Sequence, residues 1–160
     1  MKKNGFILFV GIFIIAACSK GKIFEQRQEF PNYTWNRLKP LIFEIPINDI
    51  KSEYNVYFTC RHITQYPYDD LKTNLTIYSP EGEERTTVHT FKVKNAEGKF
   101  LGEGAGDLWD LKLLVKENMS FNKAGTYKFQ IDNLMDYYDV VGLMDFGVIV
   151  EKVSPKKEKD

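Results

Sequence analysis

The fold is decided by residues 56–61, which read VYFTCR. Apolar side chains at positions 56, 58 and 60 alternate with Tyr, Thr and Arg, and residues 127–131 (YKFQI) repeat the alternation. A period of two is typical of a β-strand, in which successive side chains point to opposite faces. Both stretches therefore predict strands with one buried face.

Five further stretches are rich in β-branched and aromatic residues, which favour strands: residues 41–45, 73–78, 86–93, 111–116 and 146–151. Turn-forming residues with a glycine separate several of them, as in SPEG, NAEG and NKAG. No stretch of ten or more residues keeps a helical period of 3.6. The chain is therefore predicted to be all-β, a single antiparallel β-sandwich or jelly roll of about seven to eight strands over residues 29–153.

The composition supports one folded domain. The chain has 160 residues, 43% of them apolar, with 12 Phe, 9 Tyr and 2 Trp, which excludes a wholly disordered protein. Its 22 basic and 22 acidic side chains balance, whereas proteins that bind nucleic acid usually carry a basic excess. No nucleic-acid partner is expected, and nothing in the totals indicates an enzyme.

The N-terminus has the features of an export signal. Lysines at positions 2 and 3 precede residues 6–17, which hold only apolar side chains and a glycine, and Cys18 follows. A helix that stays in the bilayer needs about 20 apolar residues, so this run is too short to remain as an anchor. Residues 1–17 are predicted to be a signal peptide.

Residues 15–18, IAAC, resemble the lipobox of bacterial lipoproteins. The resemblance implies cleavage before Cys18, a diacylglycerol on its thiol and often an acyl chain on its amino group, which anchor a protein firmly in a membrane. Residues 19–22 contain no carboxylate, unlike the surface-export signal of Bacteroidota lipoproteins. The expected location is the periplasmic face of the outer membrane. An ordinary secretory signal with an incidental cysteine is the alternative.

Polar and charged segments flank the expected domain. Residues 18–28 are predicted to be a lipidated tether that does not fold, and residues 154–160 a charged, disordered tail. With Cys18 acylated, Cys60 is the remaining thiol in an oxidising compartment, and no intramolecular disulfide is possible. Cys60 is expected on the buried face of a central strand, and stability must come from packing.

The most unusual segment is residues 98–110, GKFLGEGAGDLWD. Its alternating glycines could cradle an anion, but the strand-loop-helix context and the lysine of a phosphate-binding loop are missing. Glu103, Asp107 and Asp110 could hold calcium, although their spacing matches no known cage. The favoured interpretation is a loop on the domain surface, permitted by glycine, with Trp109 packed against the sandwich.

Cys60, His62 and His89 are the candidates for soft metal ligands or for a thiol nucleophile with a histidine base. Residues two apart on a strand share a face, but their side chains start about 6.5 Å apart. Cysteine is also among the most buried residue types. A core cysteine and a histidine at the edge of the core are therefore favoured over catalysis.

Aromatic residues in expected loops are the candidates for contact with a partner. Tyr66 and Tyr68 flank a proline, and Tyr137 and Tyr138 are adjacent, where core packing explains an aromatic less readily. The predicted contact residues, drawn from these loops and from the segment 98–110, are Tyr66, Tyr68, Asp107, Trp109, Asp110, Tyr137 and Tyr138.

Several motifs together resemble the gliding-motility lipoprotein GldH family of Bacteroidota. These are the lipobox, GKFLG at 98–102 running into GDLWD at 106–110, GTY at 125–127, and GLMDFG at 142–147 before Val150 and Glu151. The chain has Met135-Asp136 where the family often has Met-Arg, and Asp145-Phe146-Gly147 where it often has Asp-Val-Gly. These departures indicate a divergent member.

The resemblance implies a lipoprotein of the outer membrane that accompanies the gliding machinery and its associated secretion system. Its expected partners are other cell-envelope proteins, its role is structural or in assembly, and no catalytic residue or cofactor is implied beyond the lipid on Cys18. Two alternatives stay open: a sandwich that binds glycan or peptidoglycan, and an enzyme built on Cys60, His62 and His89.

Overall fold

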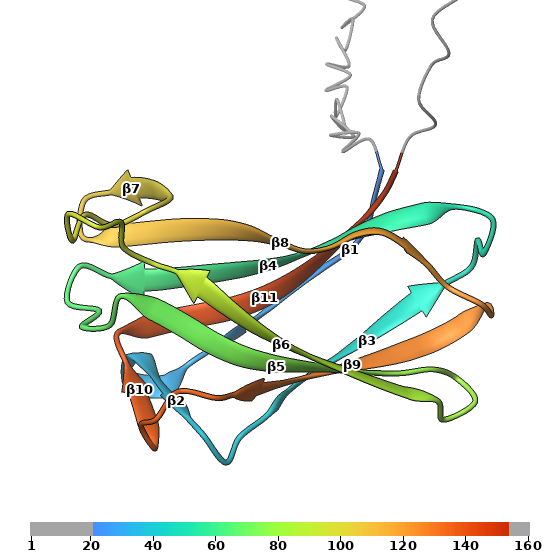
Figure 1. Ribbon diagram of the computed structural model, residues 1–160, viewed down its shortest axis with the longest axis horizontal. Coiled ribbons are helices and arrows are strands. Elements are labelled where there is room, and N and C mark those ends of the chain that lie inside the picture. The colour runs from blue at the N-terminus through green and yellow to red at the C-terminus, as the bar shows by residue number, and fades with distance from the viewer. Residues whose placement is uncertain (1–20, 154–160) are drawn as a thin grey trace, which may run out of the picture.

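Strand β4 (Glu53–Ile63) contains the VYFTCR stretch and lies at the centre of a five-stranded sheet in the computed structural model, which describes residues 21–153. This sheet has the order β1-β11-β4-β8-β7 and faces a four-stranded sheet with the order β3-β9-β5-β6 (Figure 1). A two-stranded ribbon, β10-β2, lies at one end, and every pairing is antiparallel. The predicted all-β sandwich is confirmed.

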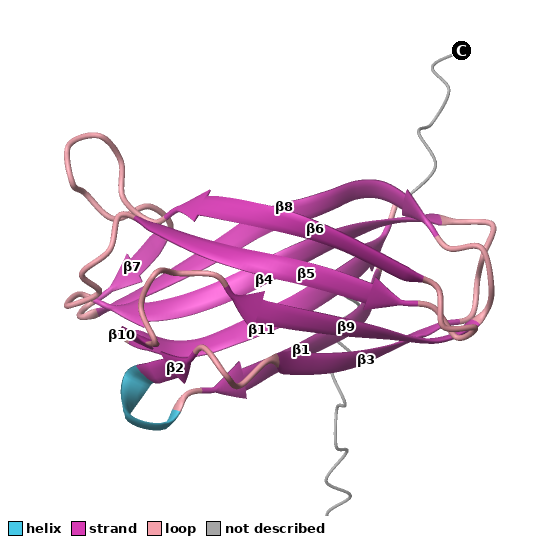
Figure 2. Cartoon of the chain, turned by 60° about the horizontal axis from the view of Figure 1, so that its bottom comes forward, coloured by secondary structure: helices cyan, strands magenta, loops and turns pink. Residues whose placement is uncertain are grey.

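Figure 2 shows the other elements of the two sheets and the ribbon. They are β1 (Lys22–Glu29), the 3-10 turn η1 (Pro31–Tyr33), β2 (Thr34–Asn36), β3 (Leu41–Ile47), β5 (Asp70–Tyr78), β6 (Glu84–Lys92), β7 (Glu103–Ala105), β8 (Leu108–Ser120), β9 (Gly125–Asn133), β10 (Asp139–Val141) and β11 (Leu143–Lys152). All seven strands expected from the sequence are present. Four more, β1, β2, β7 and β10, were not expected.

The core lies between the two large sheets and is rich in aromatic rings. Val56, Phe58 and Cys60 of β4 are fully buried, as the alternation predicts. The ring of Phe58 packs edge-on against Phe146 of β11 at 5.0 Å between centroids and against Phe91 of β6 at 5.8 Å. The contact with Phe91 joins the two sheets, whereas Phe146 lies in the same sheet as Phe58. The predicted burial of Cys60 is confirmed.

The predicted tether is wrong from Lys22 onward. Residues 22–29 form β1, which pairs with β11 over nearly its whole length. Its side chains are mostly exposed and polar, so the sequence carries no apolar alternation there; backbone hydrogen bonds to β11 place the strand. The folded domain therefore begins before the expected residue 29. The predicted signal peptide, the predicted lipidation site Cys18 and the predicted tail at 154–160 lie outside the described residues.

Within residues 21–153, no helix has the length and apolar character needed to cross a membrane.

Candidate functional site

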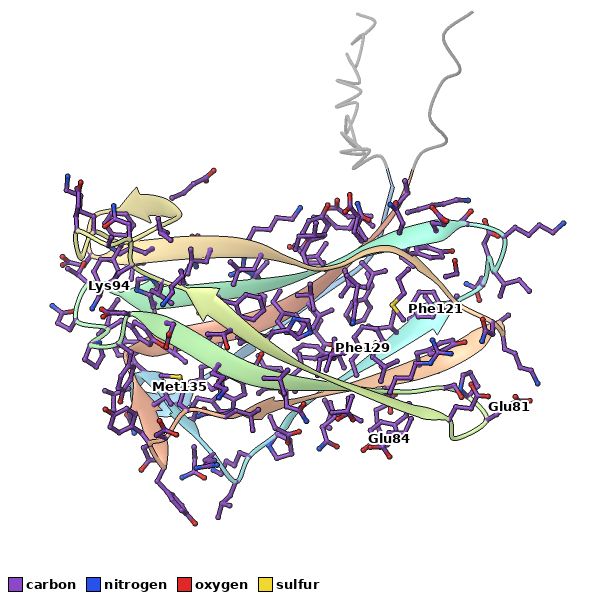
Figure 3. The ribbon with its side chains drawn as sticks, viewed as in Figure 1. Glu81, Glu84, Lys94, Phe121, Phe129 and Met135 are labelled. Atoms are coloured by element: carbon purple, nitrogen blue, oxygen red, sulfur yellow. The ribbon has the colours of Figure 1, made fainter. Side chains whose placement is uncertain are left out.

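The loops that carry the candidate residues gather at one end of the sandwich, on the left in Figure 1. They join β4 to β5, β6 to β7, β7 to β8, and β9 to β10. Lys94 and Met135 mark this end in Figure 3, whereas Glu81 and Phe121 mark the other. The antiparallel topology thus brings distant parts of the chain together here.

The glycine-rich segment forms a hairpin where a surface loop was expected. Strand β7 pairs with the start of β8, and the two residues between them are Gly106 and Asp107. Gly106 has φ of +63°, which a glycine adopts without strain at the first turn position of a two-residue hairpin. Gly104 lies opposite Trp109, and a Cβ at position 104 would approach the indole ring to 2.9 Å. Trp109 is held against its own hairpin.

A continuous series of ring contacts, here called the aromatic chain, links this hairpin to the β9–β10 loop. Ring centroids are 5.4 Å apart for Trp109–Phe100, 4.8 Å for Phe100–His62, 5.2 Å for His62–Tyr66, 5.2 Å for Tyr66–Tyr68 and 4.8 Å for Tyr68–Tyr137. The Lys94 ammonium lies 5.2 Å from the Phe100 centroid. Three predicted contact tyrosines and Trp109 therefore belong to one packed unit.

The tyrosines differ in what they offer a partner. Tyr66 is 1% exposed, and its hydroxyl donates a hydrogen bond to the backbone oxygen of Asp70 at 3.0 Å. The prediction that Tyr66 contacts a partner directly is wrong, because the residue packs inside the aromatic chain. Tyr68 is half-buried, whereas Tyr137 is 53% and Tyr138 61% exposed.

Three other exposed apolar side chains lie on backbone segments next to these two tyrosines. The set, here called the exposed patch, comprises Tyr33, Leu38, Tyr137, Tyr138 and Val141. The backbone brings its parts together, because Arg37 N donates to Tyr138 O and Gly142 N donates to Tyr33 O, each at 2.8 Å. A depression that shares Tyr137 with it is lined by Tyr68 and Met135 and also by the charged residues Asp69, Asp70, Lys72 and Asp136. Exposed apolar side chains that gather on a surface can mark interaction sites.

The outer face of the five-stranded sheet carries an ion-pair network beside the hairpin. Asp110 accepts hydrogen bonds from Arg61 Nε at 3.0 Å and Arg61 Nη2 at 2.9 Å. Arg27 Nη1 lies 2.8 Å from Asp145 Oδ1 and 3.5 Å from Asp110 Oδ1. The hydrogen bonds from Arg61, helped by the charges of both arginines, hold the pKa of Asp110 below its ordinary value. Asp110 is therefore a structural anion.

The segment Asp145-Phe146-Gly147 is also structural, and each residue has a separate role. Asp145 binds Arg27, and Phe146 is fully buried in the core. At Gly147 the Arg27 stem crosses the strand so closely that a Cβ would lie 2.6 Å from Arg27 Cγ. Because Gly147 has no side chain, the Arg27 stem has room to cross the strand and form its ion pair with Asp145.

The calcium interpretation of the hairpin has no geometric support. Asp110 is occupied by two guanidinium groups, and Asp107 lies in the exposed turn. Among residues 21–153, no three Asp, Glu, His or Cys side chains gather closely enough to hold a metal ion.

Cys60 and the two histidines do not form a nucleophile–base pair. Burial raises the pKa of the Cys60 thiol far above its ordinary value, so the thiol stays protonated. His62 uses Nδ1 toward the carbonyl of Ile63 at 3.0 Å, and His89 Nε2 lies 3.0 Å from Thr87 Oγ1. Burial lowers the pKa of both histidines, so these rings favour the neutral form. His62 is fully buried in the aromatic chain, not at the edge of the core.

Sequence reasoning missed Phe100, the two arginines and Asp145 as site residues. Phe100 lies in the quoted motif, and its apolar ring beside glycines was a usable signal. Arg61 occupies an outward position of β4, which the alternation also indicates. Arg27 could not be found, because the segment that holds it was expected to be unfolded.

Comparison with known proteins gives a consistent result. A family model described as GldH lipoprotein matches residues 22–150. "Gliding motility lipoprotein GldH" of Flavobacterium johnsoniae is 26% identical over 129 residues, which cover 81% of this chain and 79% of that protein. "Gliding motility lipoprotein GldH homolog" of Christiangramia forsetii is also 26% identical, over 94% of this chain and 98% of its own length.

Among solved structures, a chain described as "Structure of infectious bursal disease virus Gx strain" aligns with 86% of this chain and 31% of its own length. The TM-score is 0.33 and the sequence identity 12%.

Proposed function

Because the chain belongs to the GldH lipoprotein family, matched over residues 22–150, we propose that it is a lipid-anchored component of the gliding-motility machinery and its associated secretion system. Its role is structural or in assembly, and it performs no catalysis. The protonated, buried Cys60 and the absence of a hydrogen bond between it and either histidine in the described residues support a role without covalent chemistry.

The anchor is the lipidated Cys18. Strand β1 begins at Lys22, four residues further along the chain, which keeps the domain close to the membrane surface. Metabolic labelling with a tagged fatty acid tests the anchor, because Cys18→Ser removes the thiol that accepts diacylglycerol. We expect label in the wild type and none in the variant; equal labelling would contradict the anchor.

The proposed location is the periplasmic face of the outer membrane. Separation of the two membranes should place the chain with the outer-membrane fraction. Protease added to intact cells should leave it uncut until the outer membrane is permeabilised. Digestion in intact cells would instead indicate the outer surface.

The exposed patch is the proposed contact with a partner protein. Strand β1 runs from Lys22, opposite Glu151 of β11, to Glu29, which leads into η1 and β2. Eight residues of strand span about 26 Å. The patch is thus presented away from the start of the domain. The observation that carries the proposal is the aromatic chain, which links the family motif at 98–110 to Tyr137.

A photocrosslinking side chain placed at Tyr138 tests this contact in the native envelope. The matched control is Ile50, which is 47% exposed in the turn at the opposite end. We expect adducts with a specific envelope protein from position 138 and not from position 50. Equal capture at both positions, or none at position 138, would contradict the proposal.

Glycan binding is the second candidate, favoured by the adjacent exposed rings of Tyr137 and Tyr138. Aromatic rings commonly stack on sugars, so a lectin-like patch would retain the protein on purified peptidoglycan. Retention that is lost in the double variant Tyr137→Ala/Tyr138→Ala, together with no protein adduct from position 138, would favour the glycan.

A further inference from the structure

Strand β6 is an open edge of the four-stranded sheet. Its nine residues pair with β5 in an unbroken register, from Asp70 opposite Lys92 to Tyr78 opposite Glu84. The strand order places no neighbour on its other side, and Figure 2 shows β6 at the margin of its sheet. A free edge exposes unpaired backbone groups along its whole length.

The other long edges carry features that hinder strand addition. β3 contains Pro46, and the side chain of Gln28 in β1 donates to Ile42 O of β3 at 2.7 Å, which joins these two edges. β8 has two register irregularities against β4, and Asn118 within it has φ of +50°. β6 has no proline and no bulge, and residues 86–91 carry no formal charge. Natural edges usually avoid this combination.

The outward face of β6 is suited to a second strand. Every second residue from Glu84 to Lys92 is exposed on this face: Glu84, Thr86, Val88, Thr90 and Lys92. Val88 at its centre is 57% exposed, although a β-branched side chain gains stability from a neighbour across a strand pair. Glu84 projects from the surface in Figure 3.

We propose that two copies of the chain pair antiparallel through β6, about a two-fold axis at Val88. In this register Val88 faces Val88 of the second copy, Thr86 faces Thr90, and Glu84 faces Lys92 at both ends. Opposite charges and β-branched pairs in direct opposition stabilise antiparallel strands. The strand is therefore complementary to itself in charge, shape and length.

The register follows from the positions of the charges. A two-fold axis normal to the sheet keeps the outward-facing residues of one copy opposite the outward-facing residues of the other. The axis must therefore pass beside a pair of identical residues, not between two successive residues of the strand. A centre at Thr87 leaves Glu84 opposite Thr90, and a centre at His89 leaves Thr86 opposite Lys92. The Val88 register alone forms two ion pairs and uses all nine residues. Lys92 is available, because its contact with Asp70 is 3.4 Å long and largely exposed.

Disulfide crosslinking tests the pairing in the native envelope, where the protein is at its natural concentration. Antiparallel neighbours have Cα atoms about 4.5–5.5 Å apart, within the range for a disulfide. The full-length Val88→Cys chain should therefore crosslink to itself under mild oxidation and give an adduct of twice the chain mass. The parent chain, whose Cys60 is buried, gives the background.

Thr86→Cys is the matched control on the same face. In the proposed register two cysteines at position 86 lie about 13 Å apart, so this variant should stay at background, whereas a mixture of Thr86→Cys and Thr90→Cys chains should crosslink. Val88→Cys dimers no more abundant than those of Thr86→Cys would overturn the proposal. An adduct of another mass would do the same, because it would show a different protein on the edge.

A charge exchange tests the ion pairs separately from folding. Glu84→Lys in the Val88→Cys chain places lysines opposite each other and should reduce dimer yield several-fold. Adding Lys92→Glu restores opposite charges and should restore the yield. Failure of the double variant to recover, with its melting temperature unchanged, would overturn the register.

Discussion

Gly104 and Trp109 face each other across the β7–β8 hairpin, with no room between them for a side chain at position 104. A Cβ built there lies 2.9 Å from Cζ3 of the indole and 3.0 Å from two further ring atoms. The glycine therefore allows the ring to lie flat against its own backbone. This contact fixes one end of the aromatic chain.

Gly104→Val should destabilise the domain by about 1–3 kcal/mol, the usual cost of overpacking, because the indole must leave its site. Ala105→Val is the control, since it adds similar bulk to the next, exposed position of β7. Chemical denaturation followed by circular dichroism measures both. Equal stability of the two variants would show that the ring moves without cost.

Arg27→Met should cost more stability than Arg61→Met. Arg27 is the partner of Asp145, whose side chain is only 10% exposed, so its loss leaves a buried carboxylate unpaired, at a cost of about 2 kcal/mol. Arg61 pairs with Asp110, which is 40% exposed and screened by water, so its loss should cost about 0.5–1 kcal/mol. Denaturant titration compares the two variants.

Adding Asp145→Asn to Arg27→Met separates two causes of the lost stability: the unpaired carboxylate of Asp145 and the lost packing of the Arg27 stem. If the unpaired carboxylate is responsible, the double variant should recover part of the lost stability. No recovery would assign the loss to the Arg27 stem packed over Gly147.

The sequence predicted the parts of the fold that the hydrophobic pattern specifies. In β3, buried and exposed residues alternate without exception over seven positions, and β4 and β9 carry the same signal. The missed strands lack this pattern: β1 is polar apart from the adjacent Ile23 and Phe24, and β2, β7 and β10 have three residues each. Tertiary pairing places these strands, and no local pattern encodes such pairing.

The candidate site was predictable in composition but not in arrangement. Loop position marked Tyr66 and Tyr137 alike, yet only the fold shows that Tyr66 is enclosed by His62 and Tyr68. The contact between Phe100 and His62 likewise joins segments whose proximity depends on the sandwich topology. The sequence identifies the aromatic residues that must pack, whereas the fold topology determines which residues they pack against.

The Cys60 thiol should react slowly with a maleimide reagent in the folded protein and rapidly after denaturant is added. Burial removes access, and the raised pKa of Cys60 keeps the thiolate population low. Mass spectrometry over time gives the rate, with Cys60→Ala as the unlabelled control. Rapid labelling of native protein would contradict the buried position.

Acidification below about pH 6.5 should weaken the domain through its two histidines. Burial lowers the folded-state pKa of His62 and of His89, so the unfolded chain takes up protons that the folded chain does not. The free energy of unfolding therefore falls as the pH drops below the ordinary histidine value, by at most about 1.4 kcal/mol per pH unit for each ring. Denaturation between pH 7 and 5 measures the slope.

His62→Gln and His89→Gln should each flatten this slope whatever they do to stability at pH 7. The pKa of Asp110 is also shifted, but downward from 3.8, so its contribution is lost only below that range and does not interfere. A slope that neither variant changes would show that other groups titrate in the window.

Trp109→Ala tests whether the hairpin is a structural element or a recognition surface. The indole is half-buried between Gly104 and Phe100, so we expect a loss of about 3 kcal/mol, the lower end for a large aromatic. Trp109→Phe keeps a ring in place and should cost much less, because the buried Nε1 has no hydrogen-bond partner among the described residues. Thermal melts of both variants, run beside crosslinking from position 138, separate the two roles. Trp109→Ala protein with an unchanged melting temperature and no partner capture would make the hairpin itself the recognition surface.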